Sequence, residues 1–506
     1  MIIKNGYVAD GTGTPGFVSD IGIIGEFVAA VGDLSGAAAA EFVDADGKVV
    51  CPGFIDVHVH SELAILGGGD RYAPLRMGVT TQFAGADGFS WAPLSGERLS
   101  DIREYYRTFY DQRIIESETD ISIDRLLNLW KGNIPSNLAL QVPHASIRLA
   151  VMGWDARPAN DEELRQMARL AEAWLEAGAK AFATGLEYEP TRHADLRELA
   201  SLAKTSAKYG AIYVAHQRGY GDRVKAGCEE TFAIGKHADV PVHISHFTVD
   251  ELSEQLVDDA LREGVDVTFD MYPYPAGCTS LLFSLPQSVQ AGSLEEVRAR
   301  LVNPDVRRQI EEHLRASFPA DRVRFASVGI PNTGWEGKSV AEVCELLGVS
   351  LADAVCDILL QSNFQTLMIY HWPEERYGFL EKTFRHPRHM VSTDGIYVGE
   401  KPHPRGFGTF PKVLREFVYE KKWLSLEQAV WKMSGFPAKR FNLDRRGTLR
   451  SGNFADIVVF DPGTIYDGPT FHEPRSPNRG IEHVWVNGRR AIQNGVVVEG
   501  NFGMIV

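Results

Sequence analysis

The sequence predicts an α/β protein in which a (β/α)8 TIM barrel carries a small β-sandwich domain formed from both ends of the chain. Short apolar runs alternate with helical patterns between about residues 52 and 443, as a βα repeat requires. Polar residues stand where several of these runs end, and each terminus carries only part of a β-sheet. A closed barrel is favoured over a doubly wound sheet because the polar residues fall at the ends of many separate strands.

The barrel prediction rests on apolar runs of strand length and on the helical patterns between them. We expect strands at residues 54–60, 180–184, 211–216, 240–246, 265–270 and 389–394. We expect helices at residues 161–177, 195–209, 229–237 and 425–433, the last beginning with a capping box of Ser425 and Gln428. Residues from about 281 to 385 are helix-rich and too long for one βα unit, so we expect an insertion over the barrel mouth, in the position of a lid.

The two ends of the chain carry complementary halves of a β-sheet. Residues 1–51 contain short strand patterns broken by Asn-Gly and Gly-rich turns, and residues 444–506 contain further strand patterns and an Asn-Gly hairpin signal. Neither half has enough strands to bury a face alone. We therefore predict a composite β-sandwich of residues 1–51 and 444–506, with the barrel of residues 52–443 inserted between them.

Composition and charge narrow the classes of function. The 506 residues are 44% hydrophobic and 24% charged, as in an ordinary globular protein with one large domain and one smaller. A net charge of −15 repels polyanions, so we expect no nucleic-acid partner. No apolar run approaches the roughly 20 residues that span a bilayer, and the five cysteines are scattered without paired spacing. We expect no membrane association, a cytoplasmic location and a small-molecule substrate; a homo-oligomer stays open.

The first predicted strand carries two histidines in H-x-H spacing. Because side chains alternate along a strand, Asp56, His58 and His60 face one side of residues 54–60. H-x-H lets one strand offer two nitrogen ligands to one metal, and neutral imidazole suits zinc. The motif alone is weak, since two surface histidines would be the more common explanation.

Two further predicted strands also end in histidine. Residues 212–216 end at His216, and residues 242–246 end at His246. A lone histidine there is usually a hydrogen-bonded core or rim residue, but several strands ending this way are hard to explain by packing. His243 has the opposite parity to His246, so we place it between the barrel and its helices.

The last predicted strand ends at Asp394. An aspartate there would most often form a turn or cap a helix. Beside a metal, it becomes a general base. The metal lowers the pKa of bound water toward about 7, and a carboxylate can take the water's proton and pass it to the leaving group. The residues alone therefore predict metal-dependent hydrolysis with Asp394 as the proton shuttle.

Several segments resemble known families. Residues 52–60 (PGFIDVHVH) resemble the opening signature of the amidohydrolase superfamily. Segments along nearly the whole chain resemble the D-aminoacylase, or N-acyl-D-amino-acid deacylase, family: residues 78–81 (GVTT), 150–153 (AVMG), 184–188 (TGLEY), 244–246 (ISH), 272–274 (YPY), 392–395 (STDG), 403–410 (HPRGFGTF), 454–460 (FADIVVF) and 480–484 (GIEHV). The resemblance implies an amidohydrolase-type barrel that binds one or two divalent metal ions, with Zn²⁺ expected.

Carried over position by position, the resemblance also implies roles for individual residues. The family's metal ligands fall on His58, His60, His216 and His246, and its catalytic aspartate falls on Asp394. Its substrate pocket would be lined by Tyr188, Tyr272 and Arg405. Arg405 offers the forked cation that suits a carboxylate; a structural salt bridge is its alternative role.

The chain departs from the family pattern at two positions. Where the family has a metal-binding cysteine, this chain has Asp87 within residues 85–88 (GADG). A carboxylate can ligate or bridge metals, although it is harder than sulfur and can change the metal's number or identity; we expect ligation by Asp87, with a turn-forming role as the alternative. Thr248 stands where the family has a lysine expected to help hold the substrate carboxylate, so substrate identity is less secure than reaction class.

These observations lead to one principal hypothesis and three alternatives. We expect a metal-dependent hydrolase that cleaves a non-peptide C–N amide bond, with N-acyl-D-amino acids or related N-acyl compounds as substrates. The first alternative is a hydrolase of a lactam, lactone or carbamate, and the second is a lyase or decarboxylase that uses the same metal site. The third is a binding protein without catalytic activity. Burying so many polar residues costs free energy, which disfavours a barrel that has no catalytic use for them.

Overall fold

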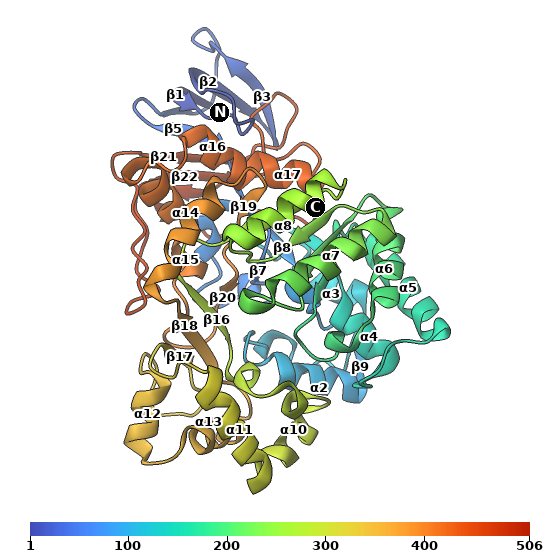
Figure 1. Ribbon diagram of the computed structural model, residues 1–506. Helices are drawn as coiled ribbons and strands as arrows, with labels where there is room; N and C mark the ends of the chain where they lie inside the picture. Colours follow the sequence, from blue (N-terminus) through green and yellow to red (C-terminus); the bar gives the residue numbers. More distant parts are fainter.

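A computed structural model describes residues 1–506 and has three parts (Figure 1). The barrel lies in the middle, a β-sheet unit built from both termini lies at one end, and an inserted segment lies at the other end. The inserted segment and the terminal sheet are therefore far apart, and only the first borders the mouth of the barrel.

Eight parallel strands form the barrel. Their order is β19-β15-β14-β13-β12-β11-β8-β6, with bounds β6 Phe54–Asp56, β8 Val79–Ala84, β11 Asn137–Pro143, β12 Ala181–Gly185, β13 Ile212–His216, β14 Val242–Ile244, β15 Val267–Met271 and β19 His389–Val391. The first and last strands meet through short extensions, because β7 (Val59–His60) pairs in parallel with β20 (Gly395–Ile396). The predicted barrel is confirmed, although residues 54–60 form two short strands with His58 between them.

Helices cover the outside of the barrel. They are α1 Ala73–Arg76, α2 Gly96–Tyr106, α3 Ile123–Trp130, α4 His144–Met152, α5 Asp161–Glu176, α6 Leu196–Ala207, α7 Val224–Ala238, α8 Glu251–Arg262 and α14 Gly378–Arg385. Helix α5 shows why such segments are helical: Asn160 and Glu163 form a capping box at its start, and Leu164, Met167 and Trp174 bury one face. Full burial of each such side chain contributes roughly 1.5–3 kcal/mol.

After β20, the chain returns toward the terminal sheet through a helical segment. Helix α15 (Arg405–Lys412) runs into a π-helical stretch, Val413–Glu420. Helix α16 (Leu426–Val430) begins with the predicted capping box of Ser425 and Gln428, and a second π-helical stretch, Trp431–Gly435, joins it to α17 (Phe436–Arg440). The helix expected at residues 425–433 is thus continued by π-helical and α-helical turns.

The barrel strands separate two apolar layers. Outward residues such as Phe182, Tyr213 and Phe269 join the large core between strands and helices. Inward residues such as Ala183 and Val214 form a smaller cluster together with Phe441, just beyond α17. The interior of the barrel is therefore a packed core, and the space for a ligand lies at the C-terminal ends of the strands.

Strands from both termini form one nine-stranded sheet, separate from the barrel. Its order is β24-β23-β22-β21-β5-β1-β2-β3, with β4 paired to β1; the bounds are β1 Ile2–Val8, β2 Phe17–Ile24, β3 Phe27–Gly32, β4 Phe42–Asp44, β5 Val49–Pro52, β21 Ile457–Phe460, β22 Ile481–Val486, β23 Arg489–Gln493 and β24 Val496–Val497. The antiparallel pairing of β5 with β21 joins the two ends of the chain. A core of its own, including Ile3, Val50 and Trp485, packs on this sheet, so each half of the sheet completes the other, as predicted.

The inserted segment contains a small sheet as well as helices. Strands β16 (Ala276–Ser280), β18 (Leu367–His371) and β17 (Val323–Ser327) pair antiparallel in that order. Its helices are α9 Gln287–Gln290, α10 Leu294–Leu301, α11 Pro304–Ser317, α12 Val340–Leu347 and α13 Leu351–Gln361. The expected insertion over residues 281–385 omitted this sheet, because β16 (AGCTS) lacks the apolar alternation that predicts a strand. Helix α14, within that expected range, contacts barrel strand β19.

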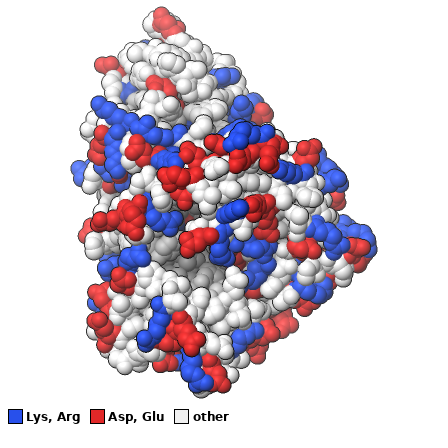
Figure 2. All heavy atoms as spheres, viewed as in Figure 1, with Lys and Arg blue, Asp and Glu red and all other residues white.

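The surface and the thiols agree with the composition. On the face drawn in Figure 2, acidic and basic side chains are interspersed and form no basic stripe. None of the helices combines the length and the apolar character needed to cross a membrane. All five cysteines are free.

Candidate metal centre

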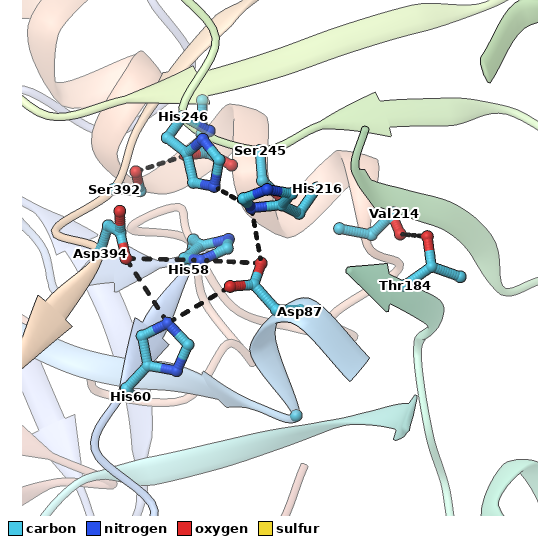
Figure 3. A network of polar contacts seen from close by, with 12 residues as sticks. His58, His60, Asp87, Thr184, Val214, His216, Ser245, His246, Ser392 and Asp394 are labelled. Carbon is cyan, nitrogen blue, oxygen red and sulfur yellow. Dashed lines mark hydrogen bonds and ion pairs between the residues drawn. The ribbon is translucent and has the colours of Figure 1, made fainter. Parts of the chain in front are cut away.

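Four histidines converge at the C-terminal end of the barrel. His58 lies between β6 and β7, His60 lies in β7, His216 ends β13, and His246 lies just beyond β14. Figure 3 shows their imidazoles pointing toward a common centre. The His216 Nδ1 and His246 Nε2 atoms are 2.9 Å apart, and the rings of His58 and His246 are 5.2 Å apart. The barrel thus brings together residues that are distant in the sequence.

Asp87 lies among these histidines (Figure 3). Its Oδ1 atom is 3.5 Å from His58 Nε2 and 3.7 Å from His216 Nδ1, and its Oδ2 atom is 3.7 Å from His60 Nε2. The side chain is 5% exposed. The two carboxylate oxygens therefore reach three of the four imidazoles.

Asp394 closes the other side of the cluster. Its Oδ1 atom is 3.6 Å from His58 Nε2 and 3.5 Å from His60 Nε2. Its Oδ2 atom is 2.9 Å from Arg405 Nη1, and the guanidinium lies 4.4 Å above the ring of Tyr272. We call His58, His60, Asp87, His216, His246 and Asp394 together the cavity floor.

The donor set of the floor fits a divalent metal ion. Two ligands held about 2.1 Å from a tetrahedral zinc ion lie about 3.4 Å apart, close to the 3.5–3.7 Å contacts of Asp87 and Asp394 with the histidines. Two groups of side chains, His58–Asp87–His246 and His58–His60–Asp394, have ligand atoms close enough to hold an ion. His58 Nε2 and Asp87 Oδ1 are buried without a hydrogen-bond partner, which is costly unless an ion binds them.

Charged neighbours keep the carboxylate of Asp394 ionised. Burial opposes the charge of Asp394, but Arg405 and the nearby histidines hold the pKa of its carboxyl well below the usual range. Burial likewise opposes protonation of His60, yet the hydrogen bond to Asp394 and the charge of Asp87 raise the pKa of its imidazole. Burial and the neighbouring His216 lower the pKa of His246 to about 4. Asp394 is therefore a proton acceptor at neutral pH, and His246 offers a neutral nitrogen.

Three residues of the floor have strained backbones. Asp87, His246 and Asp394 have φ angles of 57°, 39° and 47°, in the left-handed region that residues other than glycine rarely adopt. Such strain costs of order 1–3 kcal/mol per residue and tends to occur at functional sites. It aims each side chain at the centre, where a regular strand or turn would direct it elsewhere.

Residues that the sequence analysis missed orient the histidines. Tyr110 Oη is 2.8 Å from His60 Nδ1, and a Glu187 oxygen is 3.2 Å from His216 Nε2. The backbone N–H of His246 donates to Asp270 at 3.0 Å. A partner on the second ring nitrogen, as for His60 and His216, fixes the tautomer and orientation of a metal-ligating histidine, whereas Asp270 holds the backbone of His246. Glu187 lies within a motif that the sequence analysis singled out, whereas Tyr110 lies in a loop with no such signal.

The position predicted for His243 is wrong. Its ring nitrogens contact Thr268 Oγ1 and an Asp270 oxygen, each at 2.9 Å. Its ring lies 5.4 Å from that of Phe441 in the barrel interior. The parity argument fails because β14 ends at Ile244 and His246 has a left-handed backbone, so His243 and His246 face the same side.

A cavity of about 780 Å³ lies beside the floor. Its lining includes all four side chains expected to contact substrate, which are Tyr188, Tyr272, Arg405 and Thr248. Tyr188 Oη is 3.3 Å from His216 Nδ1, and Arg405 is 1% exposed. A ligand in this cavity would therefore contact the floor and Arg405 together.

A parallel barrel with a buried histidine and carboxylate cluster at the mouth defines the class of metal-dependent hydrolase barrels. Comparison with known proteins narrows this class. Residues 41–492 match the model of the amidohydrolase family. The chain therefore belongs to the amidohydrolase family.

Relatives of known name are similar over almost the whole chain. A D-aminoacylase of Alcaligenes xylosoxydans xylosoxydans is 34% identical, covering 96% of this chain and 93% of the relative. An N-acyl-D-glutamate deacylase of the same organism is 32% identical, covering 96% and 92%. The crystal structure of an N-acyl-D-glutamate deacylase from Bordetella bronchiseptica superposes with a TM-score of 0.84 at 30% identity, covering 100% of this chain and 98% of the other. That structure contains zinc and a phosphonate inhibitor that mimics the tetrahedral intermediate.

Proposed function

We propose that this protein is a zinc-dependent deacylase that hydrolyses N-acyl-D-amino acids to a carboxylic acid and a D-amino acid. The observation that carries this proposal is the placement of Asp394 between the histidines and Arg405. One oxygen of Asp394 lies 3.5–3.6 Å from His58 and His60, and the other lies 2.9 Å from Arg405. The histidines that would hold the metal, the proton acceptor and the cation that suits a carboxylate thus lie close enough together to contact one small substrate. The names of the relatives support the same reaction.

The floor residues would hold the zinc ion. His58, His60, His216, His246 and Asp87 would supply the nitrogen and carboxylate donors that hold it. A bound zinc ion supplies Lewis acidity, which polarises the substrate carbonyl and makes the attacking water more acidic.

Asp394 and Arg405 would divide the remaining work. The ionised Asp394 takes a proton from the attacking water and returns it to the amide nitrogen, so that the C–N bond breaks with an amine as the leaving group. Arg405 Nε has no hydrogen-bond partner in the protein, so it is free to donate to the substrate's carboxylate. The cation also holds Asp394 ionised.

Replacing Asp394 by Asn tests this division of roles. The variant keeps the size of the side chain but cannot accept the proton, so kcat should fall by about 100- to 10,000-fold while zinc remains bound. The same sample would be assayed for activity on a panel of N-acyl-D-amino acids and for zinc content by inductively coupled plasma mass spectrometry. Wild-type activity in Asp394→Asn would refute the shuttle role.

The location of the protein is a further proposal. All five cysteines are free, and Cys51 and Cys356 lie in buried cores. Reduced thiols are typical of cytoplasmic proteins. We therefore propose that the enzyme acts in the cytoplasm.

A further inference from the structure

Arg192 is a largely buried arginine that lines the cavity and has a guanidinium nitrogen without a hydrogen-bond partner. Its side chain is 9% exposed, and its ionic contact is a 3.6 Å separation between Nη1 and a Glu189 oxygen. That carboxylate is hydrogen-bonded more closely by His193, at 2.9 Å. The guanidinium has five N–H donors, and Nη1 is buried without a hydrogen-bond partner. Leaving such donors unpaired is costly, so Arg192 is suited to bind an anion.

Arg192 and Arg405 lie on opposite sides of the barrel mouth. Arg192 lies in the short 3-10 helix Thr191–His193 after β12, and its backbone N–H donates to the Tyr188 carbonyl at 2.8 Å. Arg405 begins α15, after β20, and contacts Asp394, which lies just beyond β19. In the strand order, β12 is four strands from β19 in either direction around the eight-stranded barrel. The floor lies between the two arginines, since Tyr188 contacts His216 and Arg405 contacts Asp394.

This placement constrains the shape of the substrate. In an N-acyl amino acid, the α-carboxylate and the acyl chain extend from opposite ends of a planar trans amide. With the carboxylate on Arg405 and the amide over the floor, the acyl chain points toward Arg192. We propose that the preferred substrate carries a terminal carboxylate on its acyl group, as in N-succinyl or N-glutaryl D-amino acids, and that Arg192 binds this second anion. The inference rests on the proposed deacylase function and assigns its acyl specificity.

The charge and size of the cavity support a substrate with two anionic groups. Outside the floor, the charged side chains of the lining are Glu187 and four arginines, Arg192, Arg223, Arg376 and Arg405, although the whole chain has a net charge of −15. Arg223 is paired with Glu187, and Arg376 stacks 5.3 Å from Trp372. The volume of 780 Å³ lies within the range of sites for drug-sized ligands and leaves room for a dicarboxylic acyl chain.

The proposed reaction is an ordinary hydrolysis. Water attacks the succinyl carbonyl carbon, the C–N bond breaks, and the amine nitrogen takes the proton. The products are succinate and the free D-amino acid. The reaction needs no co-reactant other than water.

A matched pair of substrates tests the inference on the zinc-loaded enzyme. N-succinyl-D-leucine and N-butanoyl-D-leucine have the same acyl length and differ in the terminal carboxylate. We expect kcat/KM to favour the succinyl compound by at least about tenfold, mainly through KM, because a charge-assisted hydrogen bond is gained. Arg192→Gln should remove this preference, so that kcat/KM for the succinyl compound falls to about the value for the butanoyl compound in the same variant. Arg192→Lys keeps the positive charge but loses the two parallel N–H donors of the guanidinium, so it should retain part of the preference for the succinyl compound.

Each outcome has a definite meaning. Arg169→Gln, on the exposed face of α5, serves as the control and should keep the full preference; zinc content and thermal unfolding check that each variant folds. Equal kcat/KM for the two substrates in wild type, or a preference that survives in Arg192→Gln, would overturn the inference and leave the deacylase function standing. An Arg192-dependent preference for N-acetyl-D-glutamate over the succinyl compound would place the second anion on the side chain and also overturn it. Hydrolysis of none of these compounds would remove the deacylase function, and the inference with it.

Discussion

The floor of the cavity and its outer wall are built in different ways. Floor residues such as His58 and Asp87 project from barrel strand ends and are 1–5% exposed. The outer wall, which we define as the cavity lining contributed by residues 276–376, includes His313, Ser317, Tyr370, Trp372 and Arg376. Tyr370 in this wall is 38% exposed. The difference suggests that the barrel fixes the chemistry, whereas the inserted segment can vary to set which substrates fit.

Replacing His216 by Ala should have the largest effect, because it removes a nitrogen donor from the floor. We expect zinc content and activity to fall together, with kcat/KM lower by about 1,000-fold or more. Metal analysis and steady-state kinetics on one preparation would check this. Ser317→Ala, in the outer wall, is the matched control and should keep zinc. Full zinc content in His216→Ala would contradict the assignment of His216 as a ligand.

Two ion pairs, one around the barrel and one in the inserted segment, allow the two regions to be compared for their effect on the free energy of unfolding. Around the barrel, Glu198 is fully buried between Arg148 and His144, with His144 Nε2 at 2.9 Å. In the inserted segment, Arg307 binds Asp357 at 2.6 Å, but the aspartate side chain is 46% exposed. Glu198→Gln should lower the free energy of unfolding by about 3 kcal/mol or more, because it leaves a buried cation unpaired. Asp357→Asn should change it by less than about 1 kcal/mol, as measured by urea unfolding.

The same buried pair predicts a pH dependence of stability. Burial alone would raise the pKa of Glu198, but the hydrogen bond from His144 and the charge of Arg148 lower it from 4.5 to about 2. Because the pKa is lower in the folded state, the stabilisation is complete above about pH 4.5 and is lost as the pH falls toward 2. Unfolding free energies of wild type and Glu198→Gln should therefore converge over this range. Parallel curves would contradict the assignment.

Replacing Thr248 by Lys should change activity least among these variants. It tests a residue that lies between the cavity floor and the outer wall. Thr248 lines the cavity next to the floor. An added ammonium group should lower KM for N-acyl amino acids by up to about tenfold with little change in kcat, because it binds the carboxylate in ground and transition states alike. An unchanged KM would show that position 248 does not contact the carboxylate.

The sequence predicted the floor better than its supports. His58, His60, His216, His246 and Asp394 could be found because each follows an apolar run of strand length, and a barrel gathers strand ends in one place. The orientation of His243 could not, because it depends on where β14 stops and on one left-handed residue. Tyr110 and Asp270 support the site through contacts between distant segments, which leave no local pattern in a single sequence.

The inserted segment was the hardest part to predict from sequence. Strand β16 is short and polar, and it pairs with β18 far along the chain. Arg192, which lies in the barrel and not in the inserted segment, was also missed, because it falls outside the segments that resemble the family, such as residues 184–188. Its unused donors become visible only when the packing around it is known.

The contact that seals the barrel also has a consequence for how the enzyme matures. The Asp394 N–H donates to the His58 carbonyl at 2.8 Å, so the pairing of the first and last strands brings the proposed proton shuttle and a proposed zinc ligand together in one step. A nascent chain still lacking residues 389–396 would have the histidines but no seam to hold them in register. Tight zinc capture should therefore begin only late in synthesis, after the ribosome has released the final strand, which would keep half-made chains from sequestering the ion.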